Sequence, residues 1–366
     1  MAVIIGVARE SAPGERRVAL TPETAKKLVA AGAVVHAQRG LGALARFPDQ
    51  AYADAGAELV DGDVLSGADV VLCVQSPPAA AIATMKQGAV LVGALHPQAD
   101  EARAAAIRER GVVAFPLERL PRTTRAQAMD ILSSQAGMAG YKAVLIAAQL
   151  APRFFPMLTT AAGTIRPSKV LVVGAGVAGL QAVATARRLD AQVECFDVRP
   201  ETREQIESLG GKFLDLGVSA AGEGGYARPL TDEERALQQQ RLAEHLKGID
   251  AIVSTAAVPG RPAPKIISAA MVDGMKPGSV IVDLAAETGG NCELTRRGET
   301  FETGNGVVVA GPVDLASMGA LHASEMFARN LYNFVSLLLR EDGLAFDWDD
   351  ELLAKTVWPE RAAAPA

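Results

Sequence analysis

The sequence predicts an α/β protein of two domains, each with a doubly wound parallel sheet, which are separated by a cleft and joined by long helices. Three observations lead to this prediction. Strand-length apolar segments alternate with helical segments over residues 3–115, and the same alternation restarts at Lys169. Between them, residues 130–150 contain few helix breakers. The length of 366 residues also suits two domains.

The first domain is predicted from short elements with recognisable ends. Thr21 can cap a helix whose first turn contains Pro22, and Gly32 can end it. Short apolar runs of the kind that fill a parallel sheet mark the strands. The expected elements are a strand over 3–7, a helix over 22–31, strands beginning at Val34 and covering 70–72 and 90–92, a helix over 100–110 and a strand over 112–115.

A helix over 130–150, ended by Pro152 and Pro156, is expected to join this domain to the second. A helix over 323–339 has one apolar face and is expected to pack back on the first domain. The predicted domains are therefore 1–135 with 320–366, and 136–319. The elements expected in the second are strands over 169–173, 192–196, 251–256 and 279–283 and a helix over 180–189.

The bulk composition argues against several classes of protein. The net charge is −6 and no basic run is present, which disfavours a nucleic-acid surface or an electrostatic membrane anchor. No stretch approaches the roughly 20 apolar residues of a membrane span, and the N-terminus does not resemble a signal peptide. The 3 cysteines and 4 histidines are scattered without metal spacing. We therefore expect a cytoplasmic chain with reduced thiols and no metal.

A glycine-rich turn predicts a dinucleotide site in a Rossmann-like second domain. The buried strand 169–173 runs directly into Gly174-Ala175-Gly176-Val177-Ala178-Gly179, and a helix and a second strand follow. Gly174 permits the tight turn, Gly176 lets the backbone approach a pyrophosphate, and Gly179 allows close packing of helix and strand. The helix N-terminus offers free N–H groups to the phosphates. The alternative is a glycine turn that serves packing alone.

An acidic residue completes this pattern. Asp197 ends the second strand, 18 residues after Gly179, where its carboxylate can accept hydrogen bonds from the adenosine ribose. It would repel a 2′-phosphate, so NAD(H) is favoured over NADP(H). Arg199 weakens this argument because a nearby arginine can accommodate that phosphate. The strands 251–256 and 279–283 also end in small or acidic residues, as expected at the floor of a cofactor crevice.

Candidates for proton transfer are few. His96 and Glu118 each follow a strand, and for each a structural role is an equal alternative. The polar segment 122–130, followed by Ser133 and Ser134, is either a cleft segment or a solvated loop in which Asp130 caps a helix. The glycine-rich segment 220–230, with Tyr226, is either a mobile lid or a surface insertion before a helix that starts at Thr231.

Four segments resemble the NAD(H)-binding domain of proton-translocating transhydrogenases, within the alanine dehydrogenase/transhydrogenase superfamily. These segments are PRTTRAQAMDILSSQAGMAGYKAV, GEGGYAR, VPGRPAP and DLAAETGGNC. The resemblance extends from the N-terminus to about Leu339. It implies direct hydride transfer between NAD(H) on this chain and NADP(H) on a partner subunit, coupled to proton translocation through a membrane subunit. It also implies a homodimer that associates peripherally with the inner membrane through its partners.

The resemblance assigns residues by motif. Gln127 would position the two nicotinamide rings, with Arg122, Asp130 and Ser133 shaping the nicotinamide and ribose site, and Tyr226 would close over the nucleotide. The full set of expected cofactor contacts is Gln127, Ala128, Met129, Asp130, Gly174, Gly176, Val177, Ala178, Gly179, Asp197, Val198, Arg199, Gly225, Tyr226, Gln238, Ala256, Ala257 and Val258.

Two other functions stay open. Arg17 and His96 resemble the substrate site of alanine dehydrogenase, but Gln75 occupies the position of its substrate-binding lysine. Without that amine, an amino-acid or oxo-acid substrate loses an anchoring charge. The third alternative is a non-catalytic NAD-sensing or interaction protein on the same fold, and the segment 122–133 argues against it.

Overall fold

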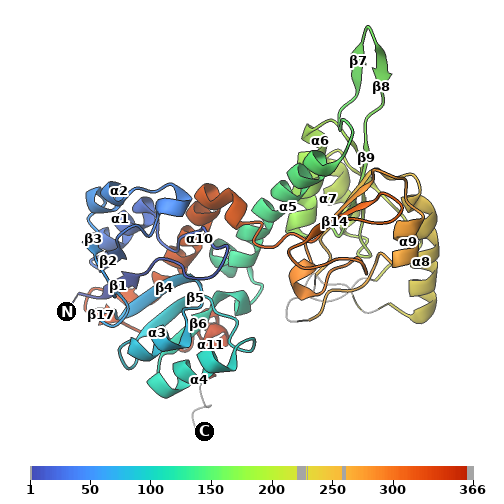
Figure 1. Ribbon diagram of the computed structural model, residues 1–366. Helices are drawn as coiled ribbons and strands as arrows, with labels where there is room; N and C mark the ends of the chain where they lie inside the picture. The colour runs from blue at the N-terminus through green and yellow to red at the C-terminus, as the bar shows by residue number, and fades with distance from the viewer. Residues whose placement is uncertain (1, 221–227, 229, 258–260, 361–366) are drawn as a thin grey trace. The chain divides into compact units, whose positions relative to one another are not determined.

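The computed structural model describes residues 2–220, 228, 230–257 and 261–360. The chain divides into unit 1, Met1–Gln135 with Ala316–Ala366, and unit 2, Ala136–Leu315. Each unit contains a largely parallel sheet with helices on both faces, so the predicted doubly wound, Rossmann-like α/β class is confirmed (Figure 1). Among the described residues, no helix has both the length and the apolar character that crossing a bilayer requires.

The sheet of unit 1 is entirely parallel, with strand order β3-β2-β1-β4-β5-β6. Its direction of winding therefore reverses between β1 and β4, and loops that leave the carboxyl ends of these strands diverge there. The strands are β1 (Ile4–Val7), β2 (Val34–Gln38), β3 (Glu58–Val60), β4 (Val70–Gln75), β5 (Val90–Ala94) and β6 (Val113–Pro116).

Helices cover both faces of this sheet because its strands alternate buried apolar side chains between two cores. One core packs α1, α2, α10 and α11 against the sheet, and the other packs α3 and α4. Thr21 caps α1 in a capping box with Thr24. The bounds are α1 (Pro22–Ala30), α2 (Asp49–Asp54), α3 (Ala79–Thr84), α4 (Glu101–Arg110), α10 (Ala320–Val335) and α11 (Glu351–Thr356), with short 3₁₀ turns η1 (Ala43–Ala45), η2 (Leu117–Arg119), η3 (Thr124–Met129) and η6 (Ser317–Gly319) and the small pair β16 (Leu339–Arg340) and β17 (Gly343–Leu344).

The sheet of unit 2 has the order β11-β10-β9-β12-β13-β15-β14, and only the pairing of β14 with β15 is antiparallel among the described strands. Val170 and Val172 of β9 face one core while Leu171 and Val173 face the other. The strands are β9 (Lys169–Val173), β10 (Gln192–Phe196), β11 (Lys212–Phe213), β12 (Ala251–Ser254), β13 (Val280–Asp283), β14 (Thr300–Glu302) and β15 (Val308–Ala310).

The helices of unit 2 also form two layers. Side chains of α5, α6 and α7 pack in one core, and those of α8 and α9 in the other. A capping box of Thr231 and Glu234 starts α8, in agreement with the expected helix start. The bounds are α5 (Ile131–Leu150), α6 (Val177–Arg188), α7 (Thr202–Ser208), α8 (Asp232–Leu246) and α9 (Ala269–Asp273), with the 3₁₀ turn η5 (Ala286–Thr288).

Several expected bounds were wrong. The helix after the glycine turn begins at Val177 instead of residue 180, because Gly176 already serves as its N-cap. The strand expected over 251–256 ends at Ser254, and the helix expected over 323–339 runs from Ala320 to Val335. The hairpin of β7 (Leu158–Thr160) and β8 (Gly163–Ile165) was not predicted, and it extends away from the sheet of unit 2 (Figure 1).

Candidate functional site

The glycine turn after β9 takes the backbone conformation that its sequence predicts. Gly174 has φ +95°, a conformation that L side chains rarely adopt. A Cβ atom at Gly174 would also lie 2.9 Å from Thr255 Oγ1. At Gly179, a Cβ atom would lie 1.8 Å from the carbonyl oxygen of Gly174, which explains why helix α6 can approach the turn so closely. Both positions therefore require glycine for the fold itself.

Gly176 differs from its two neighbours in the turn. A Cβ atom at this position would meet nothing within 4 Å, and its φ of −77° suits any residue. As the N-cap of α6, it provides no side-chain acceptor to the first N–H groups of the helix. Val177, the first helical residue, is 47% exposed although it is apolar. An open helix N-terminus of this kind is suited to a phosphate group.

Asp197 lies beside this turn, at the end of β10. One carboxylate oxygen accepts the N–H of Ala175 at 2.7 Å and Nη2 of Arg199 at 2.7 Å, and the other accepts N and Nε of Arg199, each at 2.9 Å. Burial would raise the pKa of Asp197, but the bonds from Arg199 and Ala175 outweigh burial and hold the pKa below its usual range. The structure thus brings Gly174, Gly176 and an ionised Asp197 together.

Other expected cofactor contacts in unit 2 occupy different parts of the fold. Gln238 is buried on α8, and Ala256 and Ala257 follow strand β12. Val198 is partly buried next to Asp197. Three of the expected residues, namely Gly225, Tyr226 and Val258, lie outside the described residues.

Asn291 holds the segment after β12, and the sequence reasoning did not single it out. Its side chain is fully buried; Oδ1 accepts from Ser254 Oγ at 2.7 Å and from the N–H of Ala256 at 3.1 Å. Its Nδ2 donates to the carbonyls of Ala256 and Pro264. The signal was present, because Asn291 lies within the DLAAETGGNC segment. A buried amide with both ends satisfied fixes the backbone at Ala256.

Asp283 was expected to help form the crevice floor, but its carboxylate serves the fold. It is fully buried, and its two oxygens accept hydrogen bonds from the N–H groups of Ala285 and Cys292 and from Thr295 Oγ1. These bonds shape the turn that carries Asn291. The acidic residue at this strand end is therefore a structural residue.

In unit 1, the segment with Gln127 forms η3 and leads into α5. Arg122, Gln127 and Ala128 are exposed, whereas Met129 is buried. Asp130 begins α5: its Oδ1 accepts the N–H groups of Leu132 and Ser133 at 2.9 and 3.0 Å, and Ser133 Oγ donates to its Oδ2. The capping role considered for Asp130 is thus present in the structure.

The loop after β1 carries Arg17, whose guanidinium is already paired. Its Nη2 lies 2.6 Å from Glu15 Oε2, and the two side chains are 10% and 1% exposed. Arg17 Nη1 donates to Gln135 Oε1, and Gln75 Nε2 donates to Glu15 Oε2 at 3.2 Å. Burial would raise the pKa of Glu15, but its bonds with Arg17 lower it to about 2. Glu15, which the sequence reasoning missed, therefore neutralises the arginine that would bind an acid substrate.

A second carboxylate of the same loop binds the backbone of β4. The carboxylate of Glu10 accepts the N–H groups of Val74 and Gln75, and burial raises the pKa of Glu10 to about 7. Similarly, Glu118 accepts the N–H groups of Leu95 and His96, which leaves the exposed ring of His96 3.6 Å from the carboxylate. Glu118 thus has the structural role that was one of its two alternatives, at the end of β6.

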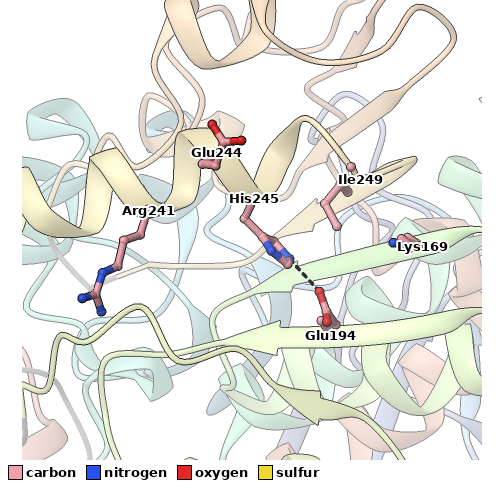
Figure 2. Close-up of a pocket in the computed structure, with 7 residues that line it drawn as sticks. Lys169, Glu194, Arg241, Glu244, His245 and Ile249 are labelled. Carbon is pink, nitrogen blue, oxygen red and sulfur yellow. Dashed lines mark hydrogen bonds and ion pairs between the residues drawn. The ribbon is translucent and has the colours of Figure 1, made fainter.

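A pocket of about 480 Å³ lies elsewhere on unit 2. It lies between α8 and the sheet, where His245 Nε2 is 2.6 Å from Glu194 Oε2 (Figure 2). Lys169, which begins β9, lines it, whereas Gly174 follows the end of that strand. The pocket is therefore not the crevice at the carboxyl ends of the strands in which nucleotides bind. Among the described residues, no group of three or more His, Cys, Asp or Glu side chains could hold a metal ion.

A parallel sheet with a glycine turn, an open helix N-terminus and an acid at the next strand end defines a Rossmann-type protein. Comparison with known families agrees. Residues 6–139 match the "Alanine dehydrogenase/PNT, N-terminal domain" and residues 143–362 match the "Alanine dehydrogenase/PNT, C-terminal domain". The chain belongs to the alanine dehydrogenase/PNT family.

Within this family, the chain is similar to transhydrogenase subunits. It is 44% identical to the first portion of the split NAD(P) transhydrogenase subunit alpha of Rhodospirillum rubrum, over 96% of this chain and 95% of the relative. A crystal structure of the transhydrogenase from Sinorhizobium meliloti superposes with a TM-score of 0.89 at 43% identity, over 98% of each chain. Alanine dehydrogenase of Bacillus subtilis is 29% identical over 80% of this chain and 72% of the relative. These similarities support an oxidoreductase role as a transhydrogenase component and imply binding of a nicotinamide nucleotide.

Proposed function

We propose that this chain binds NAD(H) and exchanges a hydride directly with NADP(H) held by a partner subunit. The observation that carries the nucleotide half of the proposal is the open turn at Gly176. Its backbone has space above it, an uncapped helix N-terminus behind it and Asp197 beside it. When bound, NAD(H) supplies or accepts the hydride. The chain orients the nucleotide and excludes water from the reacting carbon atoms.

Asp197 is proposed to select NAD(H). Its ionised carboxylate can exchange part of its bonding with Arg199 for the ribose hydroxyls, and it would repel a 2′-phosphate. The bidentate pairing by Arg199 also directs that guanidinium toward Asp197. The remaining unit 2 contacts are proposed to be those expected from the sequence, including Gln238 and Ala257.

In unit 1, Gln127 is proposed to position the nicotinamide ring, and Arg122, Asp130 and Ser133 to shape the surroundings of the ring and its ribose. No proton has to be transferred for a hydride to pass between two nicotinamides, so a segment without a titrating acid or base is sufficient. The carboxylate of Asp130 holds Ser133 and the start of α5 in place. Catalysis here rests on positioning.

Alanine dehydrogenase activity is the alternative that the polar loop of unit 1 argues against. Glu15 neutralises Arg17, and Gln75 donates a hydrogen bond to Glu15 in place of a cationic anchor. An oxo acid would therefore meet no uncompensated positive charge at these two residues. We expect the chain alone to form no NADH from NAD⁺ and alanine, as followed by absorbance. Alanine-dependent NADH formation would instead support the alternative.

The partners follow from the same proposal. An NADP(H)-binding subunit would accept the hydride, and a membrane subunit would carry the coupled proton flux and hold this chain at the inner membrane. We also infer a homodimer. Phe154, Met157 and Ile165, on and beside the β7–β8 hairpin, are 53%, 58% and 44% exposed, and pairing with a second copy would bury them. Analytical ultracentrifugation should show dimers for the native chain and a shift to monomers for Met157→Glu; a native monomer would contradict the inference.

Replacing Asp197 by Ala should weaken NADH binding about 10-fold or more, because the ribose would lose a charged acceptor. Discrimination against NADPH should also fall, since the released Arg199 could bind the 2′-phosphate. The measurement is titration of nucleotide fluorescence with both nucleotides. Asp197→Asn is the matched control, because it keeps the shape and one acceptor, and it should bind NADH with intermediate affinity. Unchanged NADH affinity in Asp197→Ala would remove the ribose assignment.

A further inference from the structure

The segment η3 presents Gln127 outward on a buried base. Ala126 and Met129 are 3% and 7% exposed and belong to the core of unit 1, whereas Gln127 and Ala128 between them are exposed. A 3₁₀ turn this short has few hydrogen bonds of its own. Its geometry must therefore be held by groups outside the turn.

Two asparagines of α10 converge on one carbonyl group of η3. Nδ2 of Asn330 and Nδ2 of Asn333 each donate to the carbonyl oxygen of Ala128 at 2.9 Å. The two residues are three apart in the helix and therefore share a face, and a carbonyl oxygen has two lone pairs with which to accept both bonds. The carbonyl that they hold follows Gln127 by one residue.

A third residue holds the start of the turn. Asp350 receives Nη1 and Nη2 of Arg125 at 2.8 and 2.5 Å. Asp350 is itself fixed, because Oδ1 accepts the N–H of Leu352 at the start of α11. Leu352 and Leu353 of that helix are fully buried in the core of unit 1. The segment after α10 is thus attached to the core on one side and to η3 on the other.

The arrangement at Asn330 is not the one that stability alone favours. Its residue is 8% exposed, and its Oδ1 is buried without a hydrogen-bond partner among the described residues. An orphaned buried acceptor costs free energy, and an apolar side chain of similar size would avoid that cost. The amide is therefore explained by its bond to Ala128.

We propose that Asn330, Asn333 and Asp350 are positioning residues for Gln127, and that α10 and the segment before α11 clamp the hydride-transfer loop from two sides. The clamp acts by fixing the backbone on either side of Gln127, at Arg125 and at Ala128. The inference rests on the proposed function of Gln127. It extends that function to α10 and to the segment before α11, where the sequence predicts no site residue.

The test uses Asn333→Asp and Asp350→Asn in the full chain, mixed with an NADP(H)-binding component. Asn333→Asp replaces a donor to Ala128 by a carboxylate that repels the carbonyl oxygen. Asp350→Asn keeps an acceptor for the cap of α11 and loses the charge that pairs with Arg125. We expect each to lower the transfer rate at saturating NADH about 10-fold, with the NADH dissociation constant within about twofold of normal.

Arg329→Gln is the matched control, because it removes an exposed ion pair of α10 with Glu23 and does not touch η3. It should transfer hydride at the normal rate. Normal transfer by Asn333→Asp and Asp350→Asn, alongside slow transfer by Gln127→Asn, would overturn the clamp and leave the proposed function in place. A native chain that transfers no hydride would overturn the proposed function itself. Loss of thermal stability without loss of rate would reduce the three residues to a structural role.

Discussion

Replacing Gln127 by Asn should slow hydride transfer about 100-fold while NADH binds with nearly its normal affinity. The reason is geometric: the side chain keeps its amide but loses one methylene, and a displacement of about 1 Å at reacting atoms can cost a factor of about 100 in rate. Gln127 is exposed on η3 and does not support the core, so the fold should be unaffected.

The measurement is single-turnover transfer in the presence of the NADP(H)-binding component, with NADH affinity determined separately by fluorescence. This pairing separates the positioning of the rings from the binding of the nucleotide. A normal rate in Gln127→Asn would remove this residue from the mechanism. A rate that falls only in proportion to weaker NADH binding would make it a simple contact.

The second large effect concerns two glycines of one turn, which should respond to the same substitution in opposite ways. Gly176→Ala should leave the fold intact, at a cost below about 1 kcal/mol for an alanine N-cap, because its Cβ meets nothing within 4 Å. Its NADH binding should fall at least about 10-fold, since the methyl group occupies the space through which a pyrophosphate approaches the backbone.

Gly179→Ala should instead destabilise unit 2, because its Cβ would lie 1.8 Å from the carbonyl oxygen of Gly174. We expect a loss of about 2–3 kcal/mol in the free energy of unfolding. Urea denaturation and NADH titration of both variants provide the comparison. Normal NADH binding by a folded Gly176→Ala variant would contradict a nucleotide phosphate at this turn.

Much of the fold could be predicted because its signals are local. The strand before Gly174, the turn and the acid of Asp197 follow one another within 29 residues of sequence, and each has a steric or electrostatic reason for its residue type. The helix starts at Thr21 and Thr231 depend on residues three positions apart. Such features need no knowledge of the rest of the chain.

Other features could not be predicted because their causes are remote in sequence or lack a periodic pattern. The β7–β8 hairpin is exposed on both faces, so it has no alternation of apolar and polar residues to indicate strands. The neutralisation of Arg17 depends on Glu15, but that pair is completed by Ser317, about 300 residues away. The bonds of Asn330 and Asn333 to Ala128 likewise link residues about 200 positions apart.

Direct observation of hydride transfer tests the central claim most directly. The full chain is mixed with a purified NADP(H)-binding component, NADH and an NADP⁺ analogue whose reduced form absorbs at its own wavelength. We expect reduction of the analogue only when both proteins are present, at a rate that Gln127→Asn sharply lowers. No reduction with both proteins saturated, together with alanine-dependent NADH formation by this chain alone, would contradict a transhydrogenase role and identify an amino-acid dehydrogenase.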